Sequence, residues 1–122
     1  MADRSVRMAW SADSDAIGGI QARSWAASYA EILPADVLSE LDPVAFAAAW
    51  KQAIDRPPSA RHRVLVALDG DRVVGFAATA PSEAPDAAAG KDGEIVAFLV
   101  DAADAGQGHG SRLLAASIDT LR

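Results

Sequence analysis

The sequence predicts a single domain of the α/β (α+β) class over residues 1–122, and three observations carry this prediction. Patterns typical of strands and helices follow one another in the order strand, helix, helix, strand, strand, strand, helix. The tripeptide Asp69-Gly70-Asp71 joins two apolar segments and is typical of a hairpin turn. Hydrophobic residues make up 51% and charged residues 23% of the chain, so we expect a packed core and not a disordered chain.

The first half of the chain is expected to hold one strand and two long helices. Alternating side chains predict a strand over residues 5–10. A helix follows to about residue 30, and we expect its large apolar residues in the core, namely Ile17, Ile20, Trp25 and Tyr29. After a short helical turn, Asp42 and Pro43 form the cap and first position of a second long helix, which residues 56–58 end.

The second half is expected to hold three strands and a helix. The strands cover residues 62–68, 72–79 and 94–100, with a polar loop over 80–93 before the third. The third strand is apolar almost throughout, which predicts burial on both of its faces and a neighbour along its edge. A glycine-containing turn leads to a helix over residues 111–122 that has no stop signal. We therefore expect the domain to be incomplete.

The composition excludes several function classes. The chain has no cysteine, which rules out disulfides, thiolate nucleophiles and cysteine-based zinc sites. Its net charge of -6 and lack of a basic cluster argue against nucleic-acid binding and mildly favour cationic partners such as amines. No apolar stretch suits a membrane span or a signal peptide, so a cytoplasmic protein is expected.

The most informative segment is the turn after the third of these strands. It places three glycines, at positions 106, 108 and 110, between a strand and a helix. Glycine allows a ligand to approach the backbone closely, and a helix N-terminus offers free N–H groups and a positive dipole end. The segment is therefore a candidate phosphate site. The P-loop and Rossmann patterns do not fit, because no lysine follows the glycines and position 111 is serine.

These features resemble the GNAT superfamily of N-acetyltransferases. The cofactor motif of that family, Gln/Arg-x-x-Gly-x-Gly/Ala, lies between its fourth strand and the next helix, and residues 108–110 match the glycine part. Residues 111–114 resemble the usual continuation, 94–100 the fourth strand and 73–76 the third strand. Trp25, Tyr29 and Leu33-Pro34 resemble the region of the first helix. Ala105 stands where the family has glutamine or arginine, and its side chain donates no hydrogen bond.

The resemblance implies a GNAT-like mixed, mostly antiparallel sheet flanked by helices, here without the usual C-terminal strands. It implies acetyl-CoA as the acetyl donor, no metal, and a primary amine of a small molecule, peptide or protein as the acceptor. The implied cofactor-binding residues are Phe98, Leu99 and Val100 on the strand and Gly106, Gln107, Gly108, His109, Gly110 and Ser111 in the turn. Glu94 matches the position of the family's carboxylate base, so it is the candidate catalytic residue.

Other interpretations remain open at this point. The glycines could form a plain turn, Glu94 could be a solvated residue, and His109 is expected to pack beneath the helix. The chain could be a proteolytic fragment, the product of a truncated gene, or one part of a homodimer or of a complex with a complementing chain. The alternative to an enzyme is a non-catalytic CoA-binding or assembly module, or an inactive fragment that needs a second chain to complete the cleft.

Overall fold

The computed structural model describes residues 4–81 and 93–121 of the chain. The elements follow in the predicted order: β1 (Arg4–Met8), α1 (Ser14–Tyr29), α2 (Ala35–Leu38), α3 (Pro43–Asp55), β2 (Arg63–Asp69), β3 (Arg72–Pro81), β4 (Gly93–Val100) and α4 (His109–Leu121). Two single 3-10 turns, Ser11–Asp13 and Ala102–Asp104, precede α1 and follow β4. None of the helices in the described ranges is long and apolar enough to cross a membrane.

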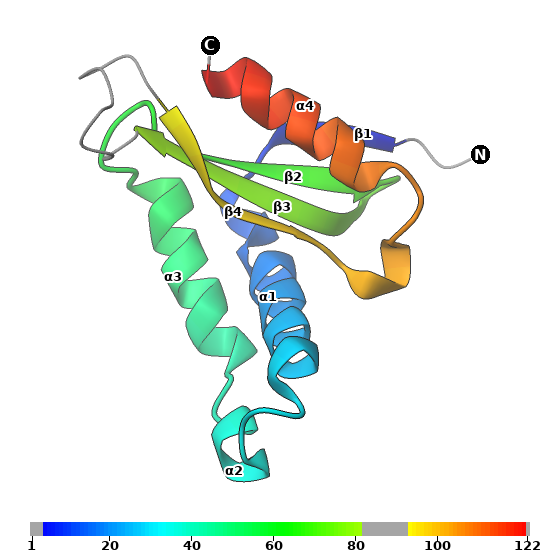
Figure 1. The fold of residues 1–122 in the computed structure, drawn as a ribbon. Coiled ribbons are helices and arrows are strands. Elements are labelled where there is room, and N and C mark those ends of the chain that lie inside the picture. The colour runs from blue at the N-terminus through cyan, green and yellow to red at the C-terminus, as the bar shows by residue number, and fades with distance from the viewer. Residues whose placement is uncertain (1–3, 82–92, 122) are drawn as a thin grey trace.

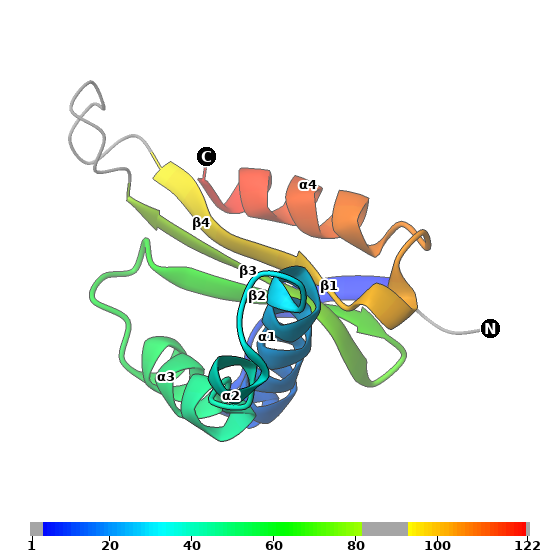
Figure 2. The ribbon, with the colours of Figure 1, turned by 60° about the horizontal axis from the view of Figure 1, so that its bottom comes forward.

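The strands form one antiparallel sheet in the order β1-β2-β3-β4 (Figure 1). The mostly antiparallel sheet flanked by helices that the sequence predicts is therefore confirmed. Asp69 pairs with Arg72, so the β2–β3 hairpin closes through Gly70, at a φ of 63°, and Asp71. Figures 1 and 2 show α1 and α3 on one face of the sheet and α4 on the other.

Each face of the sheet carries its own apolar core, because successive side chains of a strand point to opposite faces. On the face of α1 and α3 the buried residues are Ile17, Ile20, Val64, Val66, Phe76 and Ala78. On the face of α4 they are Leu65, Ala67, Val74, Ala77 and Leu113. The alternation along β2 and β3 thus anchors both helical layers to the same two central strands.

The start of α3 is the one that the sequence predicts. The carboxylate of Asp42 accepts a hydrogen bond from the N–H of Val44 at 2.9 Å, and Pro43 occupies the first helical position.

In α1, Gly18 has a role that its sequence context does not reveal. A Cβ there would lie 2.6 Å from the backbone nitrogen of Ala47, so the absence of a side chain allows α1 and α3 to pack closely.

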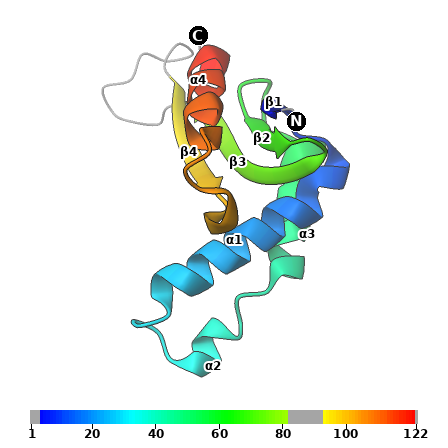
Figure 3. The same ribbon diagram turned by 90° about the vertical axis from the view of Figure 1, so that its right-hand side faces the viewer.

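Several expectations about exposure are wrong. Trp25 and Tyr29 are 39% and 43% exposed and do not lie in the core, because the second half of α1 extends beyond the sheet (Figure 3). β4 is not buried on both faces in the described residues, where it forms the edge of the sheet and leaves Val96 57% exposed. α4 begins at His109, two residues before the predicted start. The expected loop over 80–93 is shorter, since residues 80–81 belong to β3 and residue 93 belongs to β4. Residues 82–92 lie outside the described ranges.

Candidate functional site

The segment between β4 and α4 has the geometry of an anion cradle. Gly106 and Gly108 have φ angles of 80° and 84°, in the left-handed region that disfavours residues with a Cβ. The first i→i−4 bond of α4 runs from the N–H of Arg112 to the carbonyl of Gly108 at 3.2 Å. The N–H groups that precede Arg112 therefore have no i→i−4 acceptor within the helix, and they lie at its positive end.

The turn is fixed to the sheet from two sides. The N–H of Asp101 donates to the carbonyl of Val74 at 2.8 Å. Asp104 is 3% exposed and accepts two hydrogen bonds from the guanidinium of Arg72, at 2.9 and 2.7 Å. The bond from Arg72 holds the pKa of the Asp104 carboxyl below its ordinary value of 3.8, against the effect of burial. Both aspartates are thus turn residues, as the sequence suggests, and the carboxylate of Asp104 ties the turn to β3.

A guanidinium from the far end of the chain also reaches the turn. Arg4 of β1 and Arg112 of α4 both donate to the carbonyl oxygen of Gln107, each at 3.1 Å. They surround the turn with positive charge in a chain whose net charge is -6. Ala105 supplies no such group, so the cationic side chains beside the turn come from β1 and α4. No sequence signal connects Arg4 with Gln107, because 103 positions separate them.

His109 is buried beneath the start of α4, as the sequence predicts, with 1% of its surface exposed. Its Nδ1 accepts from the Nη2 of Arg112 at 3.3 Å, which assigns the ring proton to Nε2. Nε2 points to the carboxylate of Asp69 at 3.9 Å, beyond hydrogen-bond distance. The ring therefore helps to seat α4 on the β2–β3 hairpin.

The outer edge of β4 is free in the described part of the chain. β4 pairs with β3 only, so the backbone groups of its other side, along Phe98, Leu99 and Val100, have no strand partner there. The pairing is irregular: Ala78 faces Ala97 and Thr79 faces Ile95, so Val96 is an extra residue that bulges from the strand. A bulge redirects the neighbouring backbone groups, which makes this edge a candidate place for an extended ligand.

The predicted site residues fall into two groups. The glycine turn and the end of β4 lie together, since a Cβ at Gly110 would be 3.8 Å from the Cγ2 of Val100. Glu94 lies apart at the start of β4, exposed and paired in register with Ala80. At roughly 3.3 Å per residue, it is about 7 Å along the strand from the bulge at Val96 and about 13 Å from Phe98. Glu94 therefore lies nearer to the bulge than to the end of β4 that adjoins the glycine turn.

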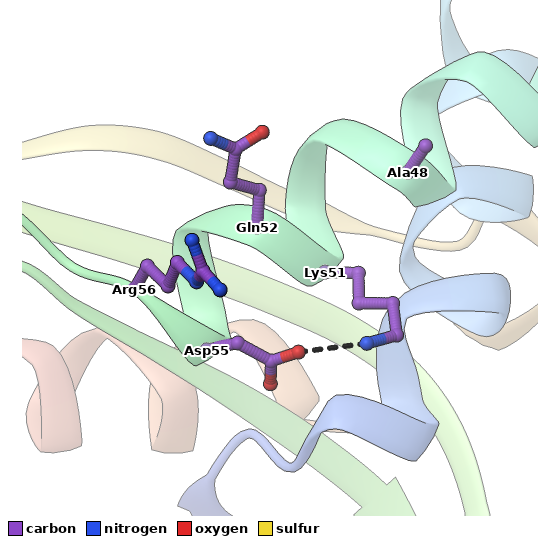
Figure 4. Close-up of a pocket in the computed structure, with 5 residues that line it drawn as sticks. All are labelled: Ala48, Lys51, Gln52, Asp55 and Arg56. Atoms are coloured by element: carbon purple, nitrogen blue, oxygen red, sulfur yellow. Dashed lines mark hydrogen bonds and ion pairs between the residues drawn. The ribbon is translucent and has the colours of Figure 1, made fainter.

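A surface hollow of about 450 Å³ lies on the outer side of α3, away from this turn (Figure 4). Two of its charged residues, Lys51 and Asp55, are paired with each other. Lys51 binds the carboxylate of Asp55 at 2.8 Å, and the hydroxyl of Ser11 donates to the same carboxylate at 3.2 Å. The hollow is shallow and lies on the opposite side of the sheet from the start of α4, so we do not connect it with the site. Among the described residues no group of histidine and carboxylate side chains has the arrangement of a metal site.

Comparison with known proteins points to one family. A model described as the acetyltransferase (GNAT) family matches residues 22–122. No curated protein sequence matches the chain. The PaiA N-acetyltransferase of Thermoplasma acidophilum, solved with coenzyme A, is 15% identical over 98% of this chain and 72% of its own, with a TM-score of 0.77.

Two further solved structures share this fold. An acetyltransferase of Corynebacterium glutamicum related to the histone acetyltransferase HPA2 is 18% identical over 98% of this chain and 71% of its own, with a TM-score of 0.68. YncA of Salmonella typhimurium, solved with its cofactor acetyl-CoA, is 23% identical over 98% of this chain and 63% of its own, with a TM-score of 0.62. The chain thus spans between three fifths and three quarters of each of these structures.

Proposed function

Since the chain belongs to the acetyltransferase (GNAT) family, we propose that it binds acetyl-CoA at the glycine turn and transfers the acetyl group to a primary amine. The observation that carries this proposal is the turn itself. Two glycines in the left-handed region precede a helix whose first N–H groups have no i→i−4 acceptor within it, and two arginines flank the turn. The coenzyme A in PaiA and the acetyl-CoA in YncA support the identity of the ligand.

We assign the pyrophosphate to the backbone of Gly106, Gln107, Gly108, His109, Gly110 and Ser111. The pantetheine arm then extends along the free edge of β4, at Phe98, Leu99 and Val100. An extended chain with amide groups suits an unpaired strand edge, because it can add to the ladder of hydrogen bonds. This places the thioester near the bulge at Val96, where a redirected backbone N–H can polarise its carbonyl oxygen.

The reaction is a direct transfer. The amine is mostly protonated at neutral pH, and we assign Glu94 the removal of that proton through water. The nitrogen lone pair then forms a bond to the carbonyl carbon as the C–S bond breaks, and the electron pair of the C–S bond leaves on sulfur. The new amide nitrogen releases its extra proton, and this proton converts the thiolate to a thiol. Glu94 is exposed, which is consistent with water as the carrier.

Calorimetric titration with acetyl-CoA tests the donor site. Gly110→Trp is the informative variant, because a Cβ at this position meets only the side chain of Val100 at 3.8 Å and the backbone is not strained. The indole would cover the turn, so we expect affinity for acetyl-CoA to fall at least tenfold. Leu114→Trp, one turn further along α4 at a residue that is 43% exposed, is the matched control and should bind normally. Equal affinity of both variants and the parent would place the ligand elsewhere.

A second candidate function is a CoA-binding module that a further chain completes. The exposed apolar residues Val96 and Phe98 on the edge strand favour it, because an uncovered apolar edge tends to pair with another strand. Thiol release in the presence of an amine distinguishes the two functions, since a module binds acetyl-CoA without turnover. Light scattering in the same buffer reports whether a homodimer accompanies either result.

A further inference from the structure

A cluster of polar and charged side chains lies beneath the glycine turn, between the start of α4 and the β2–β3 hairpin. It contains His109 and Arg112 of α4 and Asp69 at the end of β2. The Nε2 of His109, the Nε of Arg112 and the Oδ1 of Asp69 are buried, and none of them has a hydrogen-bond partner within the described residues. Buried polar atoms without a partner cost free energy, so a change of charge or position in this cluster is favourable if it pairs them.

The guanidinium of Arg112 is held against the turn by neutral acceptors. Its Nη2 donates to the carbonyl oxygen of Gln107 at 3.1 Å and to the Nδ1 of His109 at 3.3 Å. A Cβ at Gly108 would lie 3.0 Å from its Nη1, so the guanidinium packs directly on that glycine. Arg4 of β1 reaches the same carbonyl from the other side. Since hydrogen bonds from a guanidinium to a phosphate are roughly twice as strong as neutral ones, a pyrophosphate in the turn competes for Arg112.

The charges around the imidazole ring balance one another. Asp69 lies 3.9 Å from Nε2, and Arg112 lies on the side of Nδ1. Asp104 interacts with the ring from the preceding turn, and its pKa is lowered first by the hydrogen bond from Arg72 of β3 and least by His109. Arg72 neutralises Asp104 through two hydrogen bonds. If a ligand takes the guanidinium of Arg112, the carboxylate of Asp69 is left beside the ring without a balancing cation.

The contact between Arg112 and Nδ1 requires a neutral ring. The guanidinium directs an N–H at this nitrogen, which must therefore keep its lone pair. When the guanidinium turns to a phosphate, Nδ1 loses its donor and becomes able to bind a proton. The resulting imidazolium lies between Asp69 and the negative charge of the ligand, and both favour the charged form. Histidine is the side chain that ordinarily changes charge between pH 5 and pH 8, so this step falls in the physiological range.

We propose that His109 is a positioning residue that holds the guanidinium of Arg112 on the turn until a pyrophosphate takes it, and that the ring then binds one proton from solvent. The inference rests on the proposed function, because it needs the pyrophosphate at this turn. Arg112 is then a ligand-binding residue, and His109 acts through it. Ligand binding and protonation favour each other, so the affinity for a pyrophosphate rises as the pH falls.

Calorimetric titration with 3′-dephospho-CoA between pH 6 and pH 8 tests this linkage. The ligand keeps the pyrophosphate but lacks the phosphate monoester of CoA, which itself titrates at about pH 6. The affinity of the parent protein should rise at least threefold from pH 8 to pH 6, and buffers of different ionisation enthalpy should show proton uptake at pH 7. His109→Leu should remove both effects. His62→Gln is the matched control, since His62 precedes β2 at its far end from Asp69 and is the other of the two histidines.

An arginine variant tests the partner of the ring. Arg112→Gln should lower the affinity for 3′-dephospho-CoA at least fivefold at pH 7, because the pyrophosphate loses its charge-assisted hydrogen bonds. Arg56→Gln makes the same change of charge at the C-terminal end of α3, away from the turn, and should bind normally. Equal affinity of the two variants would overturn the inference.

Nuclear magnetic resonance of the ring nitrogens keeps the inference falsifiable if His109→Leu does not fold. The two histidines give two sets of ring ¹⁵N signals, and at pH 7 those of His109 should move from the neutral Nε2–H form toward imidazolium when 3′-dephospho-CoA is added. Unchanged signals at saturation, or a His109→Leu variant as dependent on pH as the parent, would overturn the inference and leave the donor site intact. Absence of binding at every pH would contradict the donor site itself, and the inference would fall with it.

Discussion

Replacement of Gly18 by alanine should destabilise the protein by about 2 kcal/mol, although alanine is the better helix former. A Cβ at this position of α1 would lie 2.6 Å from the nitrogen of Ala47 and 2.7 Å from the carbonyl oxygen of Pro43. Both are backbone atoms of α3, so no side-chain rotation relieves the contact. Overpacking typically costs 1–3 kcal/mol, and the rigid partners place this site near 3. The gain in helix propensity of about 1 kcal/mol offsets part of that cost.

Gly19→Ala is the matched control, because it makes the same change one residue later. Its Cβ would meet only the Nη1 of Arg23 at 3.2 Å, which is the end of a flexible side chain. We therefore expect Gly19→Ala to stabilise the protein by about 0.5–1 kcal/mol. Urea unfolding followed by far-UV circular dichroism measures the free energy of unfolding of both variants. In thermal unfolding, each kcal/mol should shift Tm by about 4 °C for a chain of this size. The reasoning fails if Gly18→Ala is as stable as Gly19→Ala.

Three further predictions concern a cap, a strand contact and an ion pair. Asp42→Ala should cost about 1 kcal/mol in urea unfolding, because the N–H of Val44 loses its acceptor; equal stability would show that water replaces the cap. Gly75→Ala should lower Tm, because its Cβ would lie 2.8 Å from the carbonyl oxygen of Leu99 across the β3–β4 pair. In Gly70→Ala the Cβ meets nothing within 4 Å, so only the positive φ of that residue should lower Tm. Asp104 has a lowered pKa when folded, so the unfolded chain binds its proton more tightly and stability is lost as the pH falls below 3.8. Asp104→Asn should therefore make the free energy of unfolding depend less on pH below 3.8, and Asp71→Asn should leave that dependence unchanged.

The sequence predicted best those features that local chemistry decides. The cap at Asp42, the hairpin at Gly70 and the glycine turn each depend on a few adjacent residues, and each has the predicted form. The order of the elements also follows from local periodicity, and it is confirmed. Glu94 and the cofactor contacts stay predictions, because they depend on ligands.

Features that depend on long-range contacts could not be predicted in this way. Nothing near Gly18 in the sequence indicates that α3 crosses it, and nothing near Arg4 indicates that it reaches Gln107. The apolar residues of β4 indicate burial, yet the position of a strand in a sheet is a property of the whole topology. For the same reason Trp25, whose spacing in α1 is that of a core residue, lines the mouth of a hollow.

The proposed donor site depends on how β4 is placed in the sheet. An extended pantetheine arm suits an unpaired edge, and within residues 4–81 and 93–121 β4 offers one beside the turn that leads into α4. The packing of α1 against α3 at Gly18 accompanies Trp25 and Trp50 on the other face of the same strand. The bulge at Val96 belongs both to the edge and to the wall that these two residues form.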